Sequence, residues 1–469
     1  MKMRCYVAGK PAGETEFAVK SPYSGAVVGT VTAVGRAEVE QAIRAAISER
    51  TKLTRYERYQ ILNRAGELLA QRKEDFALGI TREAGLCVRE ARYEVGRTQD
   101  VLRFCAIEAL RDDGQIFSCD ISPQGKPRKI FTTREPLNCA VAITPFNHPL
   151  NQVAHKVGPA VSVGTPIILK PSEKAPMTAL RFAELLYEAG LPGAMLSVLL
   201  GPTAEVAENL VRDERVEVVA FTGSVAVGKK ISQTAGYKKL VLELGGNDPL
   251  IVLKDADLDL ATHLAAEGSY RNSGQRCTAV KRILVEEEIA DRFAKALTEK
   301  TKEYVCGDPE NPETRVGTVI DEGAAIYLEK VLNQAVADGA KILIGGKRRG
   351  AFIEPTVIDH VSAATPMVAC ESFGPLAPII RVKSFEEAIA IANGTAYGLS
   401  SGVVTNNLDL ALRAVRELKC GTVNVNEIPG FRVENSPFGG IKDSGLGVKE
   451  GVIEAIKGLS YVKTFSLPW

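Results

Sequence analysis

The sequence predicts an α/β fold built on two parallel sheets, and two observations carry this prediction. Short apolar runs alternate with helical stretches over residues 138–246 and again over 249–430. Strands and helices that alternate at this spacing form parallel sheets covered by helices. The chain of 469 residues also exceeds what one core usually accommodates, so two or three domains are expected.

The N-terminal region is expected to add short strands and a layer of helices. Residues 1–35 are typical of strands and turns, and apolar residues then recur at helical spacing over 39–69. A further helix, rich in arginine, is predicted from about 82 to 110. After it, a Pro-Gln-Gly-Lys-Pro-Arg sequence stands between extended residues, which predicts a projecting hairpin over 115–136.

The first alternating region places polar groups where a ligand of a parallel sheet would bind. Its predicted strands are 139–144, 167–170, 196–200, 216–222 and 240–243, separated by helices near 149–163, 176–189, 203–212 and 226–235. Ligands of such sheets bind at the carboxyl ends of the strands. Four polar or glycine-rich groups fall there, namely Pro145–His148, Lys170–Glu173, Thr222–Ser224 and Glu243–Gly246. We therefore expect a ligand site along this edge.

The second alternating region predicts a separate sheet. Apolar runs at 250–253, 283–285, 341–344, 379–382, 401–404 and 422–425 alternate with helices near 288–304, 323–338, 385–393 and 408–418. The tail, Lys463–Trp469, is expected to form an edge strand on the 115–136 hairpin, within one chain or between subunits. Hairpin and tail would then form a small β element of their own.

Composition and charge exclude several classes of function. A formal net charge of +1 without a long basic run argues against nucleic acid as a partner. The nine scattered cysteines include no C-x-x-C pair and the four histidines form no H-E-x-x-H motif, so neither a disulfide framework nor a metal site is expected. The sequence has no apolar leader and no run of membrane-spanning length, which favours a cytoplasmic protein without a membrane partner.

Cys277 is the candidate nucleophile, because the stretch Asn272–Thr278 around it is small and polar. A cysteine is more often a buried structural residue, so the flanking groups must show whether Cys277 is catalytic. A thiol attacks a carbonyl only as the thiolate, and the oxyanion that forms needs fixed donors. Glu243 is a candidate base, and the Asn147 amide and the Cys277 N–H are candidate donors. Alone, Glu243 could be a solvated ion and Asn147 a turn residue.

Two familiar signatures are set aside. Gly398–Gly402 matches the G-x-S-x-G elbow of serine hydrolases, but that elbow follows a strand and here the strand at 403–404 comes after it. No G-x-G-x-x-G follows a predicted strand, so the usual dinucleotide fingerprint is missing from the sequence. A dinucleotide site in this chain would have to be built in another way.

Five motifs, in the same order over nearly the whole chain, resemble those of the aldehyde dehydrogenase superfamily. They are Phe221–Ser224, Glu243–Gly246, Gly274–Cys277, Glu371–Pro375 and Pro437–Gly440. The resemblance implies a fold with a Rossmann-like NAD-binding domain, an α/β catalytic domain and a small β oligomerisation element of a homodimer or homotetramer. The implied boundaries are 1–114 and 137–246 for the first, 247–454 for the second, and 115–136 with 455–469 for the third.

The resemblance also implies how a dinucleotide binds without the usual fingerprint. One phosphate would lie at Gly223 and Ser224, where a helix begins and its N–H groups are exposed. Glu173, at the adenine-ribose position, would accept from both hydroxyls and repel a 2′-phosphate, which favours NAD; Lys170 keeps NADP open. The other residues implied to bind the cofactor are Thr144, Pro145, Ser172, Thr222, Gly228, Leu244, Gly245, Glu371 and Phe373.

The reaction implied by the resemblance uses all three candidate catalytic residues. Cys277 would attack the aldehyde, hydride transfer would leave a thioester, and water activated by Glu243 would release the acid. Superfamily members that pass the acyl group to coenzyme A typically lack this glutamate, so hydrolysis is expected. A binding or structural member without turnover is the alternative of a different class, and the presence of Cys277, Glu243 and Asn147 together argues against it.

The substrate is expected to be a small anionic aldehyde. The resemblance places Arg97, His148, Arg276 and Arg432 along the substrate tunnel. Converging cations are costly without a counter-charge, and a phosphonate, phosphate, sulfonate or carboxylate on the substrate would supply one. Alone, Arg97 could belong to a solvated helix face. The combination of four residues therefore carries the expectation.

Two further stretches bear on which aldehyde is used. Pro145–Lys156 and Gly445–Gly451 most resemble superfamily members that oxidise phosphonoacetaldehyde, which makes it the favoured substrate. Glyceraldehyde-3-phosphate, sulfonated aldehydes and lactaldehyde are the alternatives, the first weakened because His148 replaces a tunnel tyrosine. Asn247 stands where many relatives carry lysine, and the sequence gives no reason for it.

Overall fold

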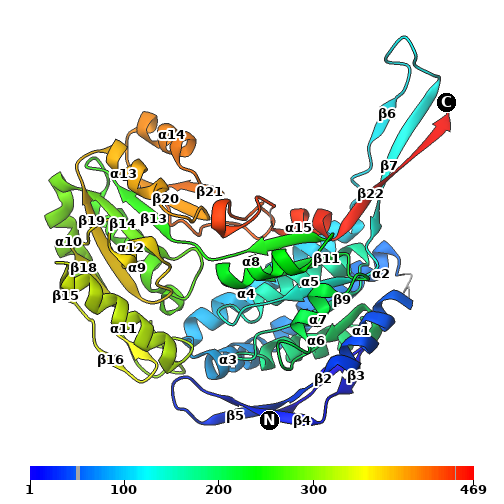
Figure 1. The fold of residues 1–469 in the computed structure, drawn as a ribbon, viewed down its shortest axis with the longest axis horizontal. Helices are drawn as coiled ribbons and strands as arrows, with labels where there is room; N and C mark the ends of the chain where they lie inside the picture. The colour runs from blue at the N-terminus through cyan, green and yellow to red at the C-terminus, as the bar shows by residue number, and fades with distance from the viewer. Residues whose placement is uncertain (49–52, 449) are drawn as a thin grey trace.

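The computed structural model describes residues 1–48, 53–448 and 450–469, so Lys449 of the Gly445–Gly451 stretch lies outside the described residues. Figure 1 shows two α/β lobes side by side and a thin β arm that projects from one of them. Among the helices of the described residues, none is both long and apolar enough to cross a bilayer.

The first lobe is built on a sheet with the strand order β12-β11-β8-β9-β10-β2-β3. These strands are β2 (Cys5–Val7), β3 (Lys10–Ala12), β8 (Ala140–Ile143), β9 (Ile167–Lys170), β10 (Leu196–Val198), β11 (Val218–Thr222) and β12 (Lys239–Glu243). The strands from β12 to β10 run parallel, as predicted, whereas β2 and β3 join antiparallel. Every residue of β8 to β11 is buried, which explains their continuous apolar runs.

Eight helices of the described residues belong to this lobe. They are α1 (Arg36–Ser48), α2 (Arg55–Gln71), α3 (Lys73–Ala84), α4 (Val88–Leu110), α5 (Asn151–Val163), α6 (Met177–Glu188), α7 (Ala207–Arg212) and α8 (Val225–Thr234). The predicted helix start near 82 is wrong, because Gly85 ends α3 with a φ of 73° and α4 begins only at Val88. A small separate sheet holds β1 (Lys2–Met3), β4 (Thr15–Lys20) and β5 (Val27–Ala33).

The second lobe is built on a sheet with the order β15-β18-β19-β14-β13-β20-β21. Its strands are β13 (Asp248–Val252), β14 (Val280–Glu286), β15 (Lys341–Ile344), β18 (Thr356–Asp359), β19 (Leu376–Val382), β20 (Ser400–Val404) and β21 (Thr422–Val425), and the two-residue strands β16 (Arg348–Arg349) and β17 (Phe352–Ile353) pair beside it. Its helices are α9 (Leu258–Tyr270), α10 (Glu287–Thr301), α11 (Glu322–Ala337), α12 (Pro366–Ala369), α13 (Phe385–Asn393) and α14 (Leu408–Glu417). Helix α9 and strand β18 are absent from the predicted elements. Because α9 is buried over most of its length, its polar face is reduced to a narrow stripe of Asp259, His263 and Glu267, and the helical period is weak.

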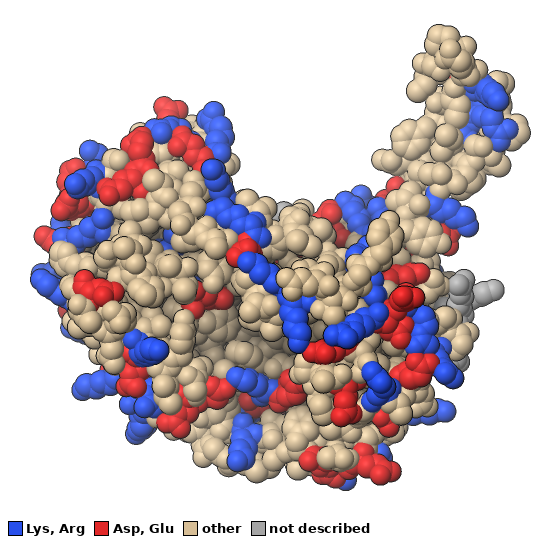
Figure 2. Space-filling view, in the orientation of Figure 1, with Lys and Arg blue, Asp and Glu red and all other residues tan. Residues whose placement is uncertain are grey.

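The projecting arm consists of β6 (Ile116–Ser118), β7 (Arg128–Pro136) and β22 (Ser460–Pro468), which follows α15 (Val452–Gly458). The three strands are antiparallel in the order β22-β7-β6, so the tail pairs with the predicted hairpin within the chain. Figure 2 shows that most of the visible surface of the arm is uncharged. Its exposed apolar side chains include Ile116, Phe117, Ile121, Phe465, Leu467 and Trp469. An exposed apolar surface of this kind is typical of an interaction site.

Candidate active site

Cys277 follows a strained turn between α9 and β14. Just before it, Asn272, Ser273 and Gly274 adopt φ angles of 57°, 52° and 70°. Residues with a Cβ rarely adopt this left-handed conformation, and the surrounding structure must hold them there. A Cβ on Gly274 would lie 2.1 Å from the Gly374 carbonyl oxygen, so only glycine fits at that position.

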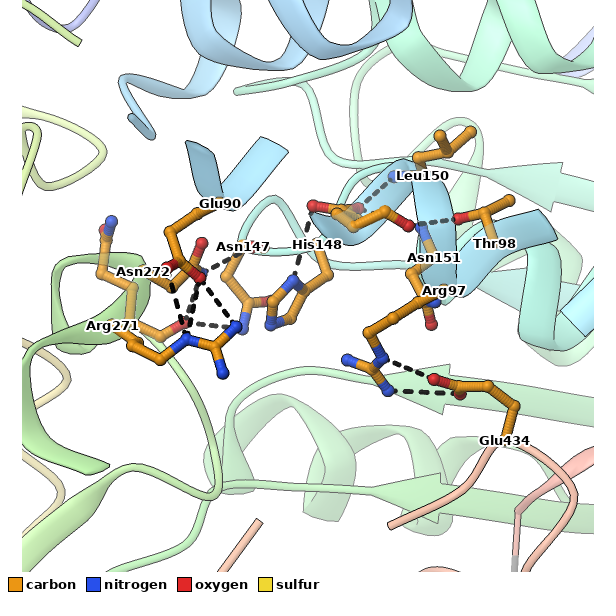
Figure 3. A network of polar contacts seen from close by, with 12 residues as sticks. Glu90, Arg97, Thr98, Asn147, His148, Leu150, Asn151, Arg271, Asn272 and Glu434 are labelled. Atoms are coloured by element: carbon orange, nitrogen blue, oxygen red, sulfur yellow. Dashed lines mark hydrogen bonds and ion pairs between the residues drawn. The ribbon is translucent and has the colours of Figure 1, made fainter. Parts of the chain in front are cut away.

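Hydrogen bonds between this turn and the end of β8 hold the strained backbone. The Asn147 side chain donates to the Gln275 carbonyl at 2.7 Å, and the Asn272 side chain donates to the Asn147 carbonyl at 2.9 Å. The Gln275 side chain in turn accepts from the Ile320 N–H at 2.8 Å. Figure 3 shows Asn147 and Asn272 facing each other across the two segments. The polar composition of the turn therefore orients the segment that carries Cys277, and the sequence analysis had assigned no such role to Asn272 or Gln275.

The thiol of Cys277 is held in its protonated form at neutral pH. Its residue is half-buried, and burial raises the pKa of the thiol to about 12 although the charge of Lys281 lowers it. The carboxylates of Glu371 and Asp248 raise it further. Since only the thiolate is nucleophilic, this cysteine needs a group that takes its proton.

Glu243, the candidate base, is the buried last residue of β12. Its backbone is fixed on two sides, because its carbonyl accepts from the Gly223 N–H at 3.1 Å and the residue bridges to Gly445. The same turn then passes directly beside the nucleophile, since a Cβ on Gly246 would lie 2.5 Å from the Cys277 carbonyl oxygen. The two glycines after Glu243 and Leu244 thus allow the base segment and the nucleophile segment to approach closely.

The groups expected to bind a dinucleotide lie along the carboxyl edge of the first sheet. Ser224 caps α8, and its side chain accepts from the Val227 N–H at 3.4 Å. Lys170 and Glu173 form an ion pair after β9. A Cβ on Gly228 would lie 2.4 Å from the Leu244 side chain, so α8 and the turn after β12 are in close contact. This edge, with a helix start, a lysine and a carboxylate beside buried strands, fits a dinucleotide.

Glu371 connects this edge to the nucleophile. It accepts from the Gly246 N–H at 3.3 Å and lies 3.2 Å from the Lys281 ammonium. A Cβ on Gly245 would lie 2.3 Å from the Glu371 carboxylate, so a larger residue there would displace that carboxylate. Phe373 has a φ of 57° and packs edge-to-face on Phe146, with ring centroids 6.1 Å apart. Of the other implied cofactor residues, Thr144 and Pro145 follow β8, Ser172 precedes Glu173, and Thr222 ends β11.

Asn247, whose presence the sequence alone does not explain, supports the Glu371 segment. Its buried side-chain amide donates to the Val368 carbonyl at 2.6 Å and to the Cys370 carbonyl at 3.3 Å. Asn247 therefore fixes the backbone directly before Glu371. The Arg282 guanidinium donates to the Asn247 carbonyl at 2.8 Å, and the Lys281 ammonium lies 3.2 Å from Glu371 itself.

A pocket of about 280 Å³ opens onto Cys277. Its lining includes all four residues expected along the substrate tunnel, Arg97, His148, Arg276 and Arg432. It also includes the carboxylates Glu90, Glu94, Glu267 and Glu427, which were not anticipated. A cavity of this size admits only a small molecule.

On the α4 side of the pocket, the protein supplies its own counter-charges. Arg97 forms a two-point ion pair with Glu434, with one N–O distance of 3.2 Å, and Figure 3 shows both contacts. The His148 ring lies 3.4 Å from Glu94. Arg97 therefore has a counter-charge from the protein itself, and its contact with a substrate anion stays a prediction. Glu434 also contacts the buried ring of His155, so this carboxylate holds one side chain of α4 and one of α5.

Two other guanidinium groups of the pocket have N–H donors without partners among the described residues. Arg276 donates to the Glu267 and Gly268 carbonyls, yet its Nε has no hydrogen-bond partner within the described ranges. Arg432 lies 4.0 Å above the Phe438 ring, and its buried Nη1 likewise lacks a partner among residues 1–48, 53–448 and 450–469. Burial and the nearby Arg271 lower the pKa of Arg276 to about 10, and burial and Arg97 lower the pKa of Arg432. An anion bound in this pocket would accept hydrogen bonds from both donors and would supply a counter-charge for the buried guanidinium groups.

Comparison with known proteins agrees with this geometry. The model of the aldehyde dehydrogenase family matches residues 7–465. The chain is 37% identical over 468 residues to a lactaldehyde dehydrogenase from Methanococcus maripaludis, covering 98% of each chain. It is 42% identical over 402 residues to a 3-sulfolactaldehyde dehydrogenase from Priestia aryabhattai, covering 86% of this chain and 84% of that one. A solved structure of NADP-dependent glyceraldehyde-3-phosphate dehydrogenase from Bacillus halodurans C-125, complexed with NADP, superposes with a TM-score of 0.97 at 33% identity, covering 100% and 99% of the two chains.

Proposed function

The chain belongs to the aldehyde dehydrogenase family, and we propose that it oxidises a small anionic aldehyde to the carboxylate with NAD as the hydride acceptor. As a family member it is an NAD(P)-dependent aldehyde dehydrogenase. We favour phosphonoacetaldehyde as the substrate. The balanced reaction consumes the aldehyde, water and the oxidised cofactor, and yields the carboxylate, the reduced cofactor and protons.

The observation that carries this proposal is that two arginine side chains beside the nucleophile have buried N–H donors without a partner among the described residues. Arg276 and Arg432 are held in a pocket that also contains Cys277. Buried guanidinium donors without partners are costly, and arginine binds phosphonate and sulfonate oxygens in a two-point geometry. The small volume of the pocket favours an aldehyde of a few carbon atoms.

The chain's own residues can perform each chemical task. Glu243 takes the proton of Cys277, whose thiolate attacks the carbonyl carbon. The Asn147 amide, which keeps one N–H beyond its bond to Gln275, and the Cys277 N–H stabilise the oxyanion. A nicotinamide cofactor held at the carboxyl edge of the first sheet would supply the acceptor for the hydride that leaves the thiohemiacetal on Cys277, and a thioester would remain. Glu243 then activates water and the acid leaves.

The role of Glu243 in the last step has its own test. In Glu243→Gln, thiol activation should be slowed but deacylation slowed more, so that a pre-steady-state burst of reduced cofactor remains at a lower rate while steady turnover falls by about 100-fold or more. Stopped-flow absorbance at 340 nm distinguishes the two phases. Equal loss of burst and turnover would assign Glu243 to thiol activation instead of deacylation.

The preference for NAD rests on Glu173. Its carboxylate, paired with Lys170, would bind the ribose hydroxyls of NAD and repel the 2′-phosphate of NADP. The Bacillus halodurans structure at 33% identity contains NADP, so the point requires measurement. Steady-state kinetics with both cofactors should give a higher kcat/KM with NAD. A clear preference for NADP would overturn the assignment.

The substrate is tested by a kinetic panel at one saturating cofactor concentration. Phosphonoacetaldehyde, sulfoacetaldehyde, 3-sulfolactaldehyde, glyceraldehyde-3-phosphate and the uncharged lactaldehyde are compared. We expect kcat/KM for phosphonoacetaldehyde to exceed that for lactaldehyde by about 100-fold, since each hydrogen bond to a charged group contributes about 1.5–3 kcal/mol. A higher kcat/KM for a sulfonated aldehyde would still support the anion site but would identify the sulfonated aldehyde as the preferred substrate. A preference for lactaldehyde would refute the anion proposal.

The projecting arm is the proposed oligomerisation element, with domain boundaries at 115–136 and 455–469. Its exposed apolar side chains support this role. The first and second lobes correspond to the proposed NAD-binding domain, 1–114 with 137–246, and catalytic domain, 247–454. Light scattering on the whole protein should give the mass of a homodimer or homotetramer, and a monomer at micromolar concentration would remove the assignment.

A further inference from the structure

Lys281 is a buried lysine beside the nucleophile that has no task in the chemistry described above. It is the second residue of β14, and its side chain is only 2% exposed. Its ammonium donates to the Cys277 carbonyl at 2.6 Å and to the Arg276 carbonyl at 2.8 Å. The Glu371 carboxylate lies 3.2 Å away. An ammonium has three donors, and each of them thus has one acceptor.

One of these contacts fixes the peptide that carries a proposed oxyanion donor, and the contact with the Cys277 carbonyl fixes the peptide that follows it. The Arg276 carbonyl and the Cys277 N–H belong to the same planar trans peptide, so they point in opposite directions. An ammonium that holds the carbonyl on one side therefore directs the N–H to the other. A simple ion pair with Glu371 would need neither carbonyl, so the geometry indicates more than charge neutralisation.

The third contact extends the connection to the cofactor edge. Glu371 accepts from the Gly246 N–H, in the turn that also carries Glu243. Lys281 therefore lies between the nucleophile and the carboxylate that the resemblance places at the nicotinamide ribose. The charged groups that act on Cys277 are Lys281 and Arg432, which lower the pKa of the thiol, and Glu371 and Asp248, which raise it.

We propose that Lys281 is a positioning residue that orients the Cys277 peptide for oxyanion binding and couples the reactivity of the thiol to Glu371. This inference rests on the proposed role of Cys277 as the nucleophile. When Glu371 engages another hydrogen-bond donor, the ammonium acts more fully on Cys277. When Glu371 faces Lys281 alone, the two charges offset each other at the thiol.

The first test measures alkylation of Cys277 by iodoacetamide in the whole protein, without substrate or cofactor. Peptide mass spectrometry follows Cys277 apart from the other eight cysteines. Below the pKa of the thiol the rate follows the thiolate fraction, so a rise of one pKa unit slows it tenfold. We expect Lys281→Met to slow alkylation at pH 8 by about tenfold, because a nearby opposite charge shifts a pKa by about 1–3 units. Lys281→Arg, which keeps the charge, should stay within about threefold of the wild-type rate.

Lys156 offers a matched control. It is equally buried, and its ammonium binds Glu450 and Thr222 instead of the nucleophile turn. Lys156→Met should therefore lower thermal stability and leave the alkylation rate of Cys277 unchanged. An equal slowing in Lys156→Met and Lys281→Met would mean that loss of any buried lysine loosens the site, which overturns the proposal.

Glu371→Gln tests the coupling with the opposite sign and does not remove the lysine. Removal of the carboxylate should speed alkylation by about threefold or more, since its charge opposes formation of the thiolate. An unchanged or slower rate would reject the coupling, even if Lys281→Met does not fold. Because iodoacetamide needs neither an anionic substrate nor a cofactor, a negative result on the kinetic panel leaves this outcome intact.

In turnover, the positioning role predicts a change in kcat rather than in KM. Lys281→Met should lower kcat by about 10-fold to 100-fold with little effect on the KM for the aldehyde, because the oxyanion forms only after binding. Lys281→Arg should recover part of the loss. A raised KM at unchanged kcat would assign Lys281 to substrate binding and contradict the proposal.

Discussion

Two parts of the substrate pocket use the same residue types for different purposes. On the α4 side, Arg97 is paired with Glu434 and His148 lies beside Glu94. Arg276 in the nucleophile turn and Arg432, two residues before Glu434, each retain a buried donor without a partner in the described part of the chain. The first part resembles a structural ion-pair network, whereas the second is arranged to receive an anion. An arginine in a pocket is therefore informative only once its partner is known.

The largest effect is expected when Glu434, the partner of Arg97, is replaced. Burial raises the pKa of Glu434, but the His155 contact and the charges of Arg97 and Arg432 outweigh burial and hold this pKa below its usual range. Glu434→Gln leaves these cations buried without the carboxylate and should cost about 3 kcal/mol of unfolding free energy at pH 7.

The pH dependence of that loss checks its origin. A carboxyl group with a depressed folded pKa stabilises the protein above its unfolded pKa of about 4.3, and this contribution is lost as the pH falls through the folded value. Denaturant titrations should therefore show that the difference in unfolding free energy between wild type and Glu434→Gln becomes smaller below about pH 4. A gap that stays constant from pH 7 to pH 3 would attribute the loss to packing.

Arg432→Ala is expected to have the next largest effect, on substrate selectivity. Loss of the guanidinium should lower kcat/KM for phosphonoacetaldehyde by about 100-fold, or roughly 2.7 kcal/mol, and that for lactaldehyde by less than about threefold. Arg432→Lys should recover part of the difference, because it restores the charge without the two-point geometry. Equal losses for both aldehydes would indicate damage to the pocket instead of loss of an anion contact.

A smaller effect is expected at Arg276. Two of its hydrogen bonds already go to backbone carbonyls, so fewer donors face the substrate. Arg276→Met should lower kcat/KM for the anionic aldehyde by about tenfold more than for lactaldehyde. The alkylation rate of Cys277 serves as the control here, since a large change would show that the neighbouring thiol itself was disturbed.

The smallest effect on selectivity is expected when the ion pair on the α4 side is removed as a unit. The double variant Arg97→Met with Glu434→Gln changes no net charge in the pocket, so the ratio of the two kcat/KM values should stay within about threefold of wild type. The same steady-state panel measures it. A tenfold or larger fall in the ratio would show that Arg97 binds the substrate anion despite its partner.

Local sequence was sufficient for most of the architecture. The parallel strands β8, β9 and β11 were predicted because their runs are short, apolar and regularly separated, and the Cys277 turn because it is polar where core would be expected. Helix α9 escaped prediction since it is buried over most of its length and its polar face is a narrow stripe of Asp259, His263 and Glu267. The break at Gly85 was missed although a glycine between two periodic stretches is a recognised signal.

The charge state of the pocket could not be predicted from the sequence. Arg97 and Glu434 stand 337 residues apart, and nothing local to either marks the other as its partner. The same holds for Lys281 and Glu371, which β14 and the segment after α12 bring together. Residue types along a tunnel can be inferred from a family resemblance, but pairing depends on long-range packing.

The most direct test of the anion site is calorimetric binding of phosphonoacetate, the product of the favoured reaction, in the absence of turnover. Wild type and the double variant Arg97→Met with Glu434→Gln should bind it with dissociation constants within about threefold of each other, whereas Arg432→Ala should bind about 100-fold more weakly. Equal weakening in the double variant and in Arg432→Ala would contradict the account, because both parts of the pocket would then hold the anion.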